Sequence, residues 1–148
     1  MKRHEALARL SRDHHQALFQ AVRMRRATEE DAAEVLENFL DYWNDVGNLH
    51  FRAEEEVLLP AYSAHADTRQ EAVVRVLVDH VELRRAAYEL GETRGGAVSP
   101  DLLRAAGDKL EAHVRHEERV LFPLIEAALS DEELVRVARR VDEVERAA

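Results

Sequence analysis

The feature that most constrains this chain is an eleven-residue segment that occurs twice. Residues 50–60, HFRAEEEVLLP, and residues 113–123, HVRHEERVLFP, share the pattern H-x-R-x-E-E-x-V-L-x-P at an offset of 63 residues. Each copy places a histidine four residues before a glutamate, and this spacing puts both side chains on one face of a helix. Imidazole and carboxylate on one face can bind one metal ion together or help to bridge two. The duplication therefore predicts two helices that each carry part of a metal site.

A second, shorter repeat precedes each copy of the segment. Asp13-His14 lies upstream of the first copy and Asp79-His80 upstream of the second, at an offset of 66 residues. Each half of the chain then has one helix with a histidine and one with His-x-x-x-Glu, and His15 remains an alternative to His14. The candidate metal ligands are His14 (or His15), His50, Glu54, His80, His113 and Glu117. Six ligands suit two metal ions that share the glutamates, with positions left for water or a small molecule.

Apolar residues at helical spacing run through the whole chain. They predict five helices, over residues 3–26, about 28–64, 68–90, 100–129 and 131–145. Ser99-Pro100 is a strong start for the fourth helix, and Pro60 is expected to kink the second. Long helices with short connections predict an all-α protein: an antiparallel up-down-up-down four-helix bundle with a short extra C-terminal helix. Residues 1–148 are expected to form one domain, with the metal-binding bundle over about 3–129.

One pair of candidate ligands fits this arrangement poorly. His14 lies about thirteen residues before the first predicted turn, whereas His50 lies about twenty-one residues beyond it. At 1.5 Å per residue the two imidazoles would differ in depth by roughly 12 Å. Either the first helix ends early, with residues 24–31 forming a longer connection, or the second helix bends near Gly47-Asn48.

Composition narrows the possible chemistry. The 148 residues include no cysteine, which excludes disulfides, thiolate nucleophiles, iron–sulfur clusters and Cys-ligated zinc. Imidazole and carboxylate ligands suit iron, manganese or zinc. The net charge of −9 argues against a nucleic-acid partner. No apolar run approaches the length of a membrane span, and residues 1–5 lack the apolar segment of a signal peptide, so we expect no membrane contact and a cytoplasmic location.

Two other metal-binding patterns disagree with the spacing. Ferritin-like di-iron bundles use Glu-x-x-His, with the glutamate first, and zincins use His-Glu-x-x-His. Here the histidine leads and the glutamate follows four residues later. His116 replaces the alanine of the first copy, and Glu118 is turned about 100° from Glu117. We therefore expect both side chains beside the ligands or at the surface, and no catalytic side chain beyond the metal centre.

The order H … HxxxE … H … HxxxE, with the blocks HF..EE..L.P and H...EE..LFP, resembles the hemerythrin HHE cation-binding domain. The likeness covers roughly residues 7–128. It implies two iron ions, joined by an oxo or hydroxo bridge, between four helices, with manganese or zinc as possible substitutes. It also implies that Glu54 and Glu117 bridge the metals. By the same resemblance, one iron would be bound by His14 (or His15) and His50, and the other by His80 and His113.

One departure from the family pattern bears on function. Oxygen-carrying hemerythrins have a fifth histidine four residues after the one on the third helix, and this chain has Arg84 there. The resemblance then implies a protein that binds O2, peroxide or NO in a redox or oxidative-stress response, with catalase-like peroxide breakdown as a candidate activity. Arg84 is either a group that stabilises a bound anion or a plain surface arginine. The alternative function is a non-catalytic iron or oxygen sensor, or a metal-binding module, that acts through a protein partner.

Overall fold

The computed structural model describes residues 2–146, and every regular element in that range is helical. In chain order these elements are the 3-10 turn η1 (Glu5–Leu7), α1 (Ala8–Arg25), α2 (Ala32–Tyr42), the π turn η2 (Trp43–Gly47), α3 (Asn48–Ala53), the π turn η3 (Glu54–Leu58), α4 (Leu59–Ser63), α5 (Glu71–Glu92), α6 (Pro100–His116), the π turn η4 (Glu117–Leu121), α7 (Phe122–Ala128) and α8 (Asp131–Arg146). They form five helical segments, because η2 to α4 continue α2, and η4 and α7 continue α6. The all-α class predicted from the sequence is confirmed.

Local signals set the helix ends close to where the sequence predicts them. The Ser99 hydroxyl accepts a hydrogen bond from the Leu102 N–H, which caps α6 just before Pro100. At the start of α8 the Ser130 hydroxyl accepts from the Glu133 N–H, and the Glu133 carboxylate accepts from the Ser130 N–H. This reciprocal pair is a capping box, and it satisfies two N–H groups that have no partner within the helix.

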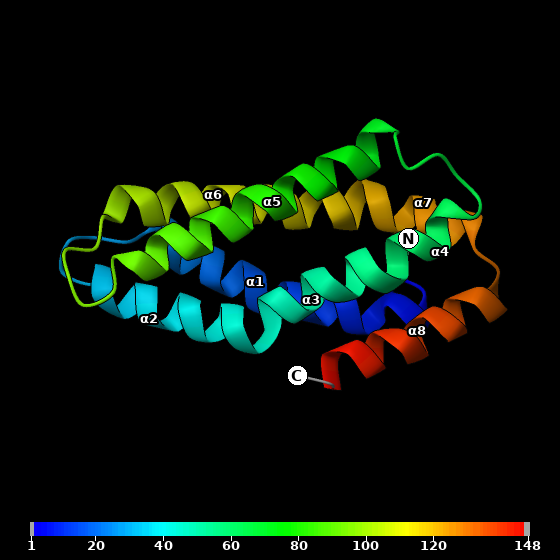
Figure 1. Ribbon diagram of the computed structural model, residues 1–148, viewed down its shortest axis with the longest axis horizontal. Coiled ribbons are helices and arrows are strands. Elements are labelled where there is room, and N and C mark those ends of the chain that lie inside the picture. The colour runs from blue at the N-terminus through cyan, green and yellow to red at the C-terminus, as the bar shows by residue number, and fades with distance from the viewer. Residues whose placement is uncertain (1, 147–148) are drawn as a thin grey trace.

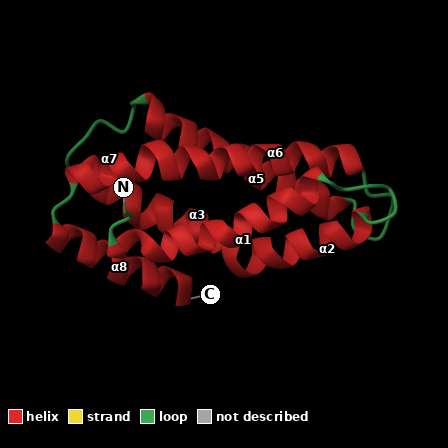
Figure 2. Ribbon diagram, turned by 180° about the vertical axis from the view of Figure 1, so that it is seen from behind, coloured by secondary structure: helices red, strands yellow, loops and turns green. Residues whose placement is uncertain are grey.

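The long helical segments lie side by side along one axis, and the loops gather at the two ends of the molecule (Figures 1 and 2). α1 packs most extensively against α6, and it also packs against α2, while α5 packs against α6 and α2. α8 lies against α3, η3 and the η1 turn, near the end where α4 and α7 meet. Among residues 2–146, none of the helices combines the length and apolarity that crossing a bilayer requires.

The core consists of two apolar clusters with a polar layer between them. Along α1, Leu10 belongs to one cluster and Ala17 to the other, and the buried His14 lies between them. The clusters follow in the same order along α5, on either side of His80, and in the reverse order along α6 with η4. Because dry apolar packing closes the layer on both sides, its polar groups are shielded from solvent.

The two copies of the repeated segment each contain a π turn that begins at the glutamate. In η3 the Leu59 N–H donates to the Glu54 carbonyl, five residues back, and η4 (Glu117–Leu121) repeats this arrangement. The proline of each copy follows directly after this turn region. Pro60 has no N–H, and its ring crowds the carbonyl four residues before it, so a wider turn relieves the contact. A π turn, a feature that often accompanies a helix kink, therefore lies where Pro60 is expected to disturb the helix.

The depth mismatch between His14 and His50 is absorbed by the connection and by a bend. α1 ends at Arg25 and residues 26–31 separate it from α2, so both alternatives from the sequence are present in part. The π turn Trp43–Gly47 bends the second segment, and Figure 1 shows the chain changing direction between α2 and α3. Gly47 allows this bend, because an added Cβ would lie 2.9 Å from an aromatic ring carbon. As a result the two imidazole centroids lie only 4.8 Å apart.

Candidate metal centre

The fold gathers all six candidate ligands in the polar layer. They come from α1, α3 with η3, α5, and α6 with η4, and each is buried. Both glutamates have no exposed surface at all. The set is His14, His50, Glu54, His80, His113 and Glu117.

Their donor atoms form two overlapping groups of four. Within each group the nitrogen and oxygen atoms lie within 4.8 Å of one another. The groups differ in their histidines and share both glutamates: the first contains His14 and His50, the second His80 and His113, and both contain Glu54 and Glu117. Two metal positions with common carboxylates therefore fit the observed geometry.

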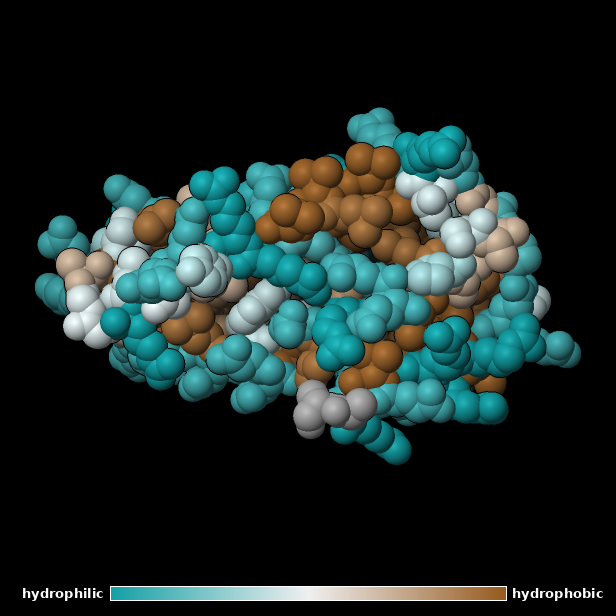
Figure 3. Space-filling model, viewed as in Figure 1, coloured by the Kyte–Doolittle hydropathy of each residue, from teal (hydrophilic) through white to brown (hydrophobic). Residues whose placement is uncertain are grey.

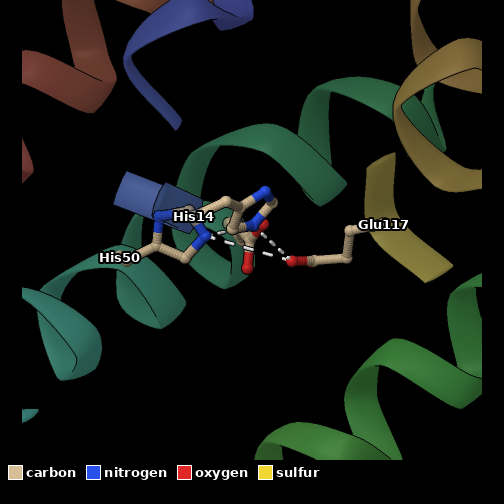
Figure 4. A group of neighbouring side chains, drawn as sticks. His14, His50 and Glu117 are labelled. Atoms are coloured by element: carbon tan, nitrogen blue, oxygen red, sulfur yellow. Dashed lines mark hydrogen bonds and ion pairs between the residues drawn. The ribbon is translucent and has the colours of Figure 1, made fainter. Parts of the chain in front are cut away.

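The Glu117 carboxylate lies between three imidazoles. Its Oε1 atom is 3.0 Å from Nε2 of His14, 3.2 Å from Nε2 of His113 and 4.0 Å from Nε2 of His50. Figure 4 shows His14, His50 and Glu117 pointing toward one another from α1, α3 and η4. An oxygen with several imidazole nitrogens around it has the environment of a ligand at a shared metal centre.

The Glu54 carboxylate and the remaining imidazoles carry buried atoms that lack hydrogen-bond partners. Glu54 Oε2 is 3.2 Å from Nε2 of His50, and Oε1 is 3.1 Å from Nε2 of His80. Within residues 2–146, both carboxylate oxygens of Glu54 lack a partner with hydrogen-bond geometry. The Nε2 atoms of His50, His80 and His113 lack one as well. Unsatisfied buried polar atoms cost free energy. Metal cations bound among these atoms would satisfy them, so the donor set fits the group that the family pattern implies.

Aspartates hold the outer nitrogens of two imidazoles. Nδ1 of His50 is 3.0 Å from Asp13 Oδ2, and Nδ1 of His113 is 3.1 Å from Asp79 Oδ2. A carboxylate in this position fixes the ring orientation and leaves Nε2 free for a metal. No role for these two aspartates was predicted from the sequence. The signal that could have found them is the repeated Asp-His pair itself, whose aspartate serves a histidine on another helix.

The other two imidazoles receive glutamates from the opposite half of the chain. Nδ1 of His14 is 2.6 Å from Glu118 Oε2, and Nδ1 of His80 is 2.6 Å from Glu55 Oε2. Glu118 thus lies beside a candidate ligand, which is one of the two positions expected for it from the sequence. Every imidazole of the cluster therefore has a carboxylate at Nδ1 and faces the shared glutamates with Nε2.

Three candidates from the sequence lie outside the cluster. The Arg84 guanidinium is 3.3 Å from Glu55 Oε1 and is about one-third exposed, so it supports the carboxylate that holds an imidazole. His116 is largely buried, its Nε2 lies 2.9 Å from the Ala72 carbonyl oxygen, and it belongs to neither group of donor atoms. His15 is exposed, so the geometry favours His14 at this position.

Two phenylalanines from the repeated segments pack on the imidazoles. The Phe51 ring stacks on His80 with centroids 3.8 Å apart, and Phe122 stacks on His14 at 5.4 Å. These buried rings fill the space beside the polar layer and restrict the orientation of the imidazoles. The candidate centre is therefore both dry and rigid on the sides that these rings cover.

Electrostatics hold the cluster together without metal. Burial lowers the pKa of the His113 imidazole, but the charge of Glu117 and the hydrogen bond to Asp79 raise it to about 10. Burial raises the pKa of Glu117, but the charge of His113 and the hydrogen bond from His14 hold it well below its usual range. In the metal-free protein these shifts favour a His113 imidazolium beside a Glu117 carboxylate. A metal cation would replace the Nε2 proton, because a ligating histidine must be neutral at Nε2.

The side chains around Asp13 differ from those around Asp79, its counterpart in the second half of the chain. Asp13, His50 and Glu145 each offer a donor atom within 4.8 Å of the others, and Arg9 Nε lies 2.6 Å from Glu145 Oε2. Glu145 belongs to α8, so this helix contacts the hydrogen-bond chain of His50. In the second half the corresponding aspartate has Arg75 at 4.0 Å instead. The two histidine pairs therefore lie in unequal electrostatic environments.

A helical fold and a buried histidine–glutamate cluster with shared carboxylates define a metal-cation-binding protein of the imidazole–carboxylate class. The family described as Hemerythrin HHE cation binding domain matches residues 6–125. The chain belongs to this family, which confirms the resemblance drawn from the sequence. A search of curated proteins and a search of solved structures each returned no match. α8 lies beyond the matched residues.

Proposed function

We propose that the protein is a non-haem di-iron protein that binds O2, peroxide or NO in a redox or oxidative-stress response. The observation that carries the proposal is the pair of four-donor groups that share both glutamates. Two metal ions placed in these groups would have two imidazoles each and two carboxylates in common. The proposed ligands are His14 and His50 for one iron, His80 and His113 for the other, and Glu54 and Glu117 for both.

The finer architecture belongs to the same proposal. The pairwise packing of α1, α2, α5 and α6 supports an antiparallel up-down-up-down four-helix bundle, with α8 added beside it. Each histidine would then come from a different wall of the bundle. A cytoplasmic location stays a prediction from the sequence.

The chain's own residues account for how such a centre would be held. Asp13, Asp79, Glu55 and Glu118 keep the Nε2 atoms of the imidazoles aimed at the shared carboxylates. The two apolar clusters exclude water on both sides of the layer. Bound iron would supply Lewis acidity and redox electrons. A small ligand is favoured over a large substrate, because the donor cluster is fully buried.

The lack of a fifth histidine supports redox handling of a small molecule rather than reversible oxygen carriage. Arg84 stands at that position and pairs with Glu55, so it adds no ligand. One metal therefore has fewer protein donors than in an oxygen carrier. Catalase-like breakdown of peroxide is the activity that we test first, with manganese or zinc as substitute metals in the controls.

A second candidate function is a non-catalytic sensor that acts through a protein partner. The observation that favours it is the contact between Glu145 of α8 and Asp13, which is hydrogen-bonded to His50. Through this contact, a change in metal occupancy at His50 would alter the seating of α8. A partner whose binding is unaffected by metal removal and by oxidation would contradict this function.

The test is metal analysis and absorption spectroscopy of protein purified without chelators, followed by addition of peroxide. We expect about two irons per chain, visible absorption from iron and oxygen release from peroxide. His14→Ala should lose metal. His15→Ala is the matched control, because the His15 imidazole is exposed and lies outside the cluster. One metal per chain, or none after growth in ample iron, would refute the di-iron proposal. Two irons without oxygen release would favour the sensor.

A further inference from the structure

α5 is apolar on two faces. One face is buried in the core, and on the other Val74, Leu77, Val78 and Val81 are exposed, with Val81 at 69%. These four residues follow the spacing i, i+3, i+4, i+7 and line one shallow hollow on the surface. Figure 3 shows the apolar side chains gathered over α5. A helix that is apolar on both faces is normally covered on both.

Four charged side chains flank the exposed stripe. Glu71, Arg75, Glu82 and Arg85 all lie on the solvent side of α5, and at 100° per residue they fall along one edge of the stripe. Positions of opposite charge lie at similar distances on either side of Val78, the centre of the stripe. Glu71 and Arg85 lie seven residues on either side of Val78, and Arg75 and Glu82 lie three and four residues from it. A two-fold axis at Val78 would therefore bring Glu71 of one copy near Arg85 of the other. Within one chain Arg85 also pairs with Glu89 at 2.8 Å, and Glu82 with Lys109 at 3.0 Å.

The same axis matches the apolar side chains. Val74 and Val81 lie four and three residues from Val78, so each valine of one copy would face the other valine of the second. Leu77 and Val78 would meet at the axis. In an antiparallel helix pair, residues on one edge face the same edge of the partner, as this matching requires. In a parallel pair this edge would instead face the opposite edge of the partner, so the pairing of Glu71 with Arg85 would be lost.

We propose that the stripe on α5 is the interface for a second copy of this chain, packed antiparallel about a two-fold axis at Val78. The interface is isologous, as in most homodimers. His80 lies two residues from the axis, so the dimer places the two metal centres on either side of one interface. A single helix pair is smaller than a standard interface of roughly 800 Å² per partner. We therefore expect a reversible, concentration-dependent dimer.

Analytical ultracentrifugation of the metal-loaded full chain over a wide concentration range tests the association. Val81→Asp should weaken dimerisation at least tenfold, because it places two carboxylates in the apolar contact. Val135→Asp is the matched control, since the Val135 side chain is also exposed, at 53%, but lies on α8. A wild-type chain that stays monomeric at the highest concentration overturns the proposal, and so does a Val81→Asp chain that dimerises like the wild type. In the monomeric case, the stripe would serve a different protein.

Charge reversal tests the two-fold matching. Glu71→Arg and Arg85→Glu should each weaken the dimer severalfold, and the double variant should recover most of the wild-type affinity. Recovery requires that residue 71 of one copy faces residue 85 of the other. A double variant weaker than both single variants overturns this register.

Cross-linking locates the axis directly. The chain has no cysteine, so Val78→Cys introduces a single thiol. At the axis this thiol would meet its own copy, and a short bis-maleimide should link the chains rapidly. Val135→Cys is the control for random collision. Equal cross-linking rates for the two variants contradict an interface centred on Val78.

Discussion

Gly107 marks the closest approach of α1 and α6, and it offers a sharp test of how tightly these helices are packed. A Cβ added there would lie 2.8 Å from the Met24 Cβ and 2.9 Å from the Ala21 carbonyl oxygen. Neither atom belongs to a flexible side-chain end, so the helices would have to separate. Overpacking of this kind costs about 1–3 kcal/mol, while alanine gains about 1 kcal/mol of helix propensity over glycine. We therefore expect Gly107→Ala to lower the free energy of unfolding by up to about 2 kcal/mol.

The assay is urea unfolding of the metal-free protein, followed by circular dichroism, with a chelator present to remove stabilisation by bound metal. Gly91→Ala is the matched control, because an added Cβ at this position on α5 meets nothing within 4 Å. It should raise stability by up to about 1 kcal/mol. In melting experiments the two variants should separate by several degrees, at about 2–4 °C per kcal/mol. If Gly107→Ala is as stable as Gly91→Ala, the reasoning from close packing is wrong.

Three further predictions concern the metal centre. The raised pKa of His113, about 10, stabilises the metal-free fold fully below pH 6.5, and this contribution is lost as the pH rises toward 10. The lowered pKa of Glu117 adds stability above pH 4.5, and this stability is lost in acid. The urea midpoint of the metal-free protein should therefore be highest between pH 4.5 and 6.5. Once metal is bound, the midpoint should fall less at high pH. Asp79→Asn should weaken metal binding about 10- to 100-fold in chelator competition, with Asp101→Asn as an exposed control, and an unchanged affinity would contradict its role. Arg84→Ala should retain two metals and change the free energy of unfolding by less than about 1 kcal/mol, because the ion pair of Arg84 with Glu55 is partly exposed. Loss of a metal would show that Arg84 does more than support the Glu55 carboxylate.

Much of the fold follows from short-range signals in the chain. Ser99 before Pro100 and the Ser130–Glu133 pair set helix starts through hydrogen bonds that are local in sequence. The π turns were harder to foresee. Pro60 indicates that the regular helical turn before it must be disturbed. The packing of the next helix decides which carbonyl group shifts.

The candidate site was predictable where the sequence repeats itself. The duplicated segment pointed to His50 and His113, and the structure brings both into the cluster. The hydrogen-bond partners of their Nδ1 atoms were not predictable from spacing, because Asp13 and Asp79 lie 37 and 34 residues away on other helices. Glu145 lies outside the repeat, so no internal comparison could reveal its contact with Asp13.

The exchange of glutamates between the two halves has a consequence for how such a chain can arise. Glu118 of the second half holds His14 of the first, and Glu55 of the first half holds His80 of the second. Neither half alone contains a histidine helix together with the glutamate that supports it. Two identical copies of one half would supply each other with what each lacks. Gene duplication and fusion of such a self-complementing ancestor would give the present order of motifs. Either half would then be free to diverge, as the packing of α8 mainly against elements of the first half illustrates.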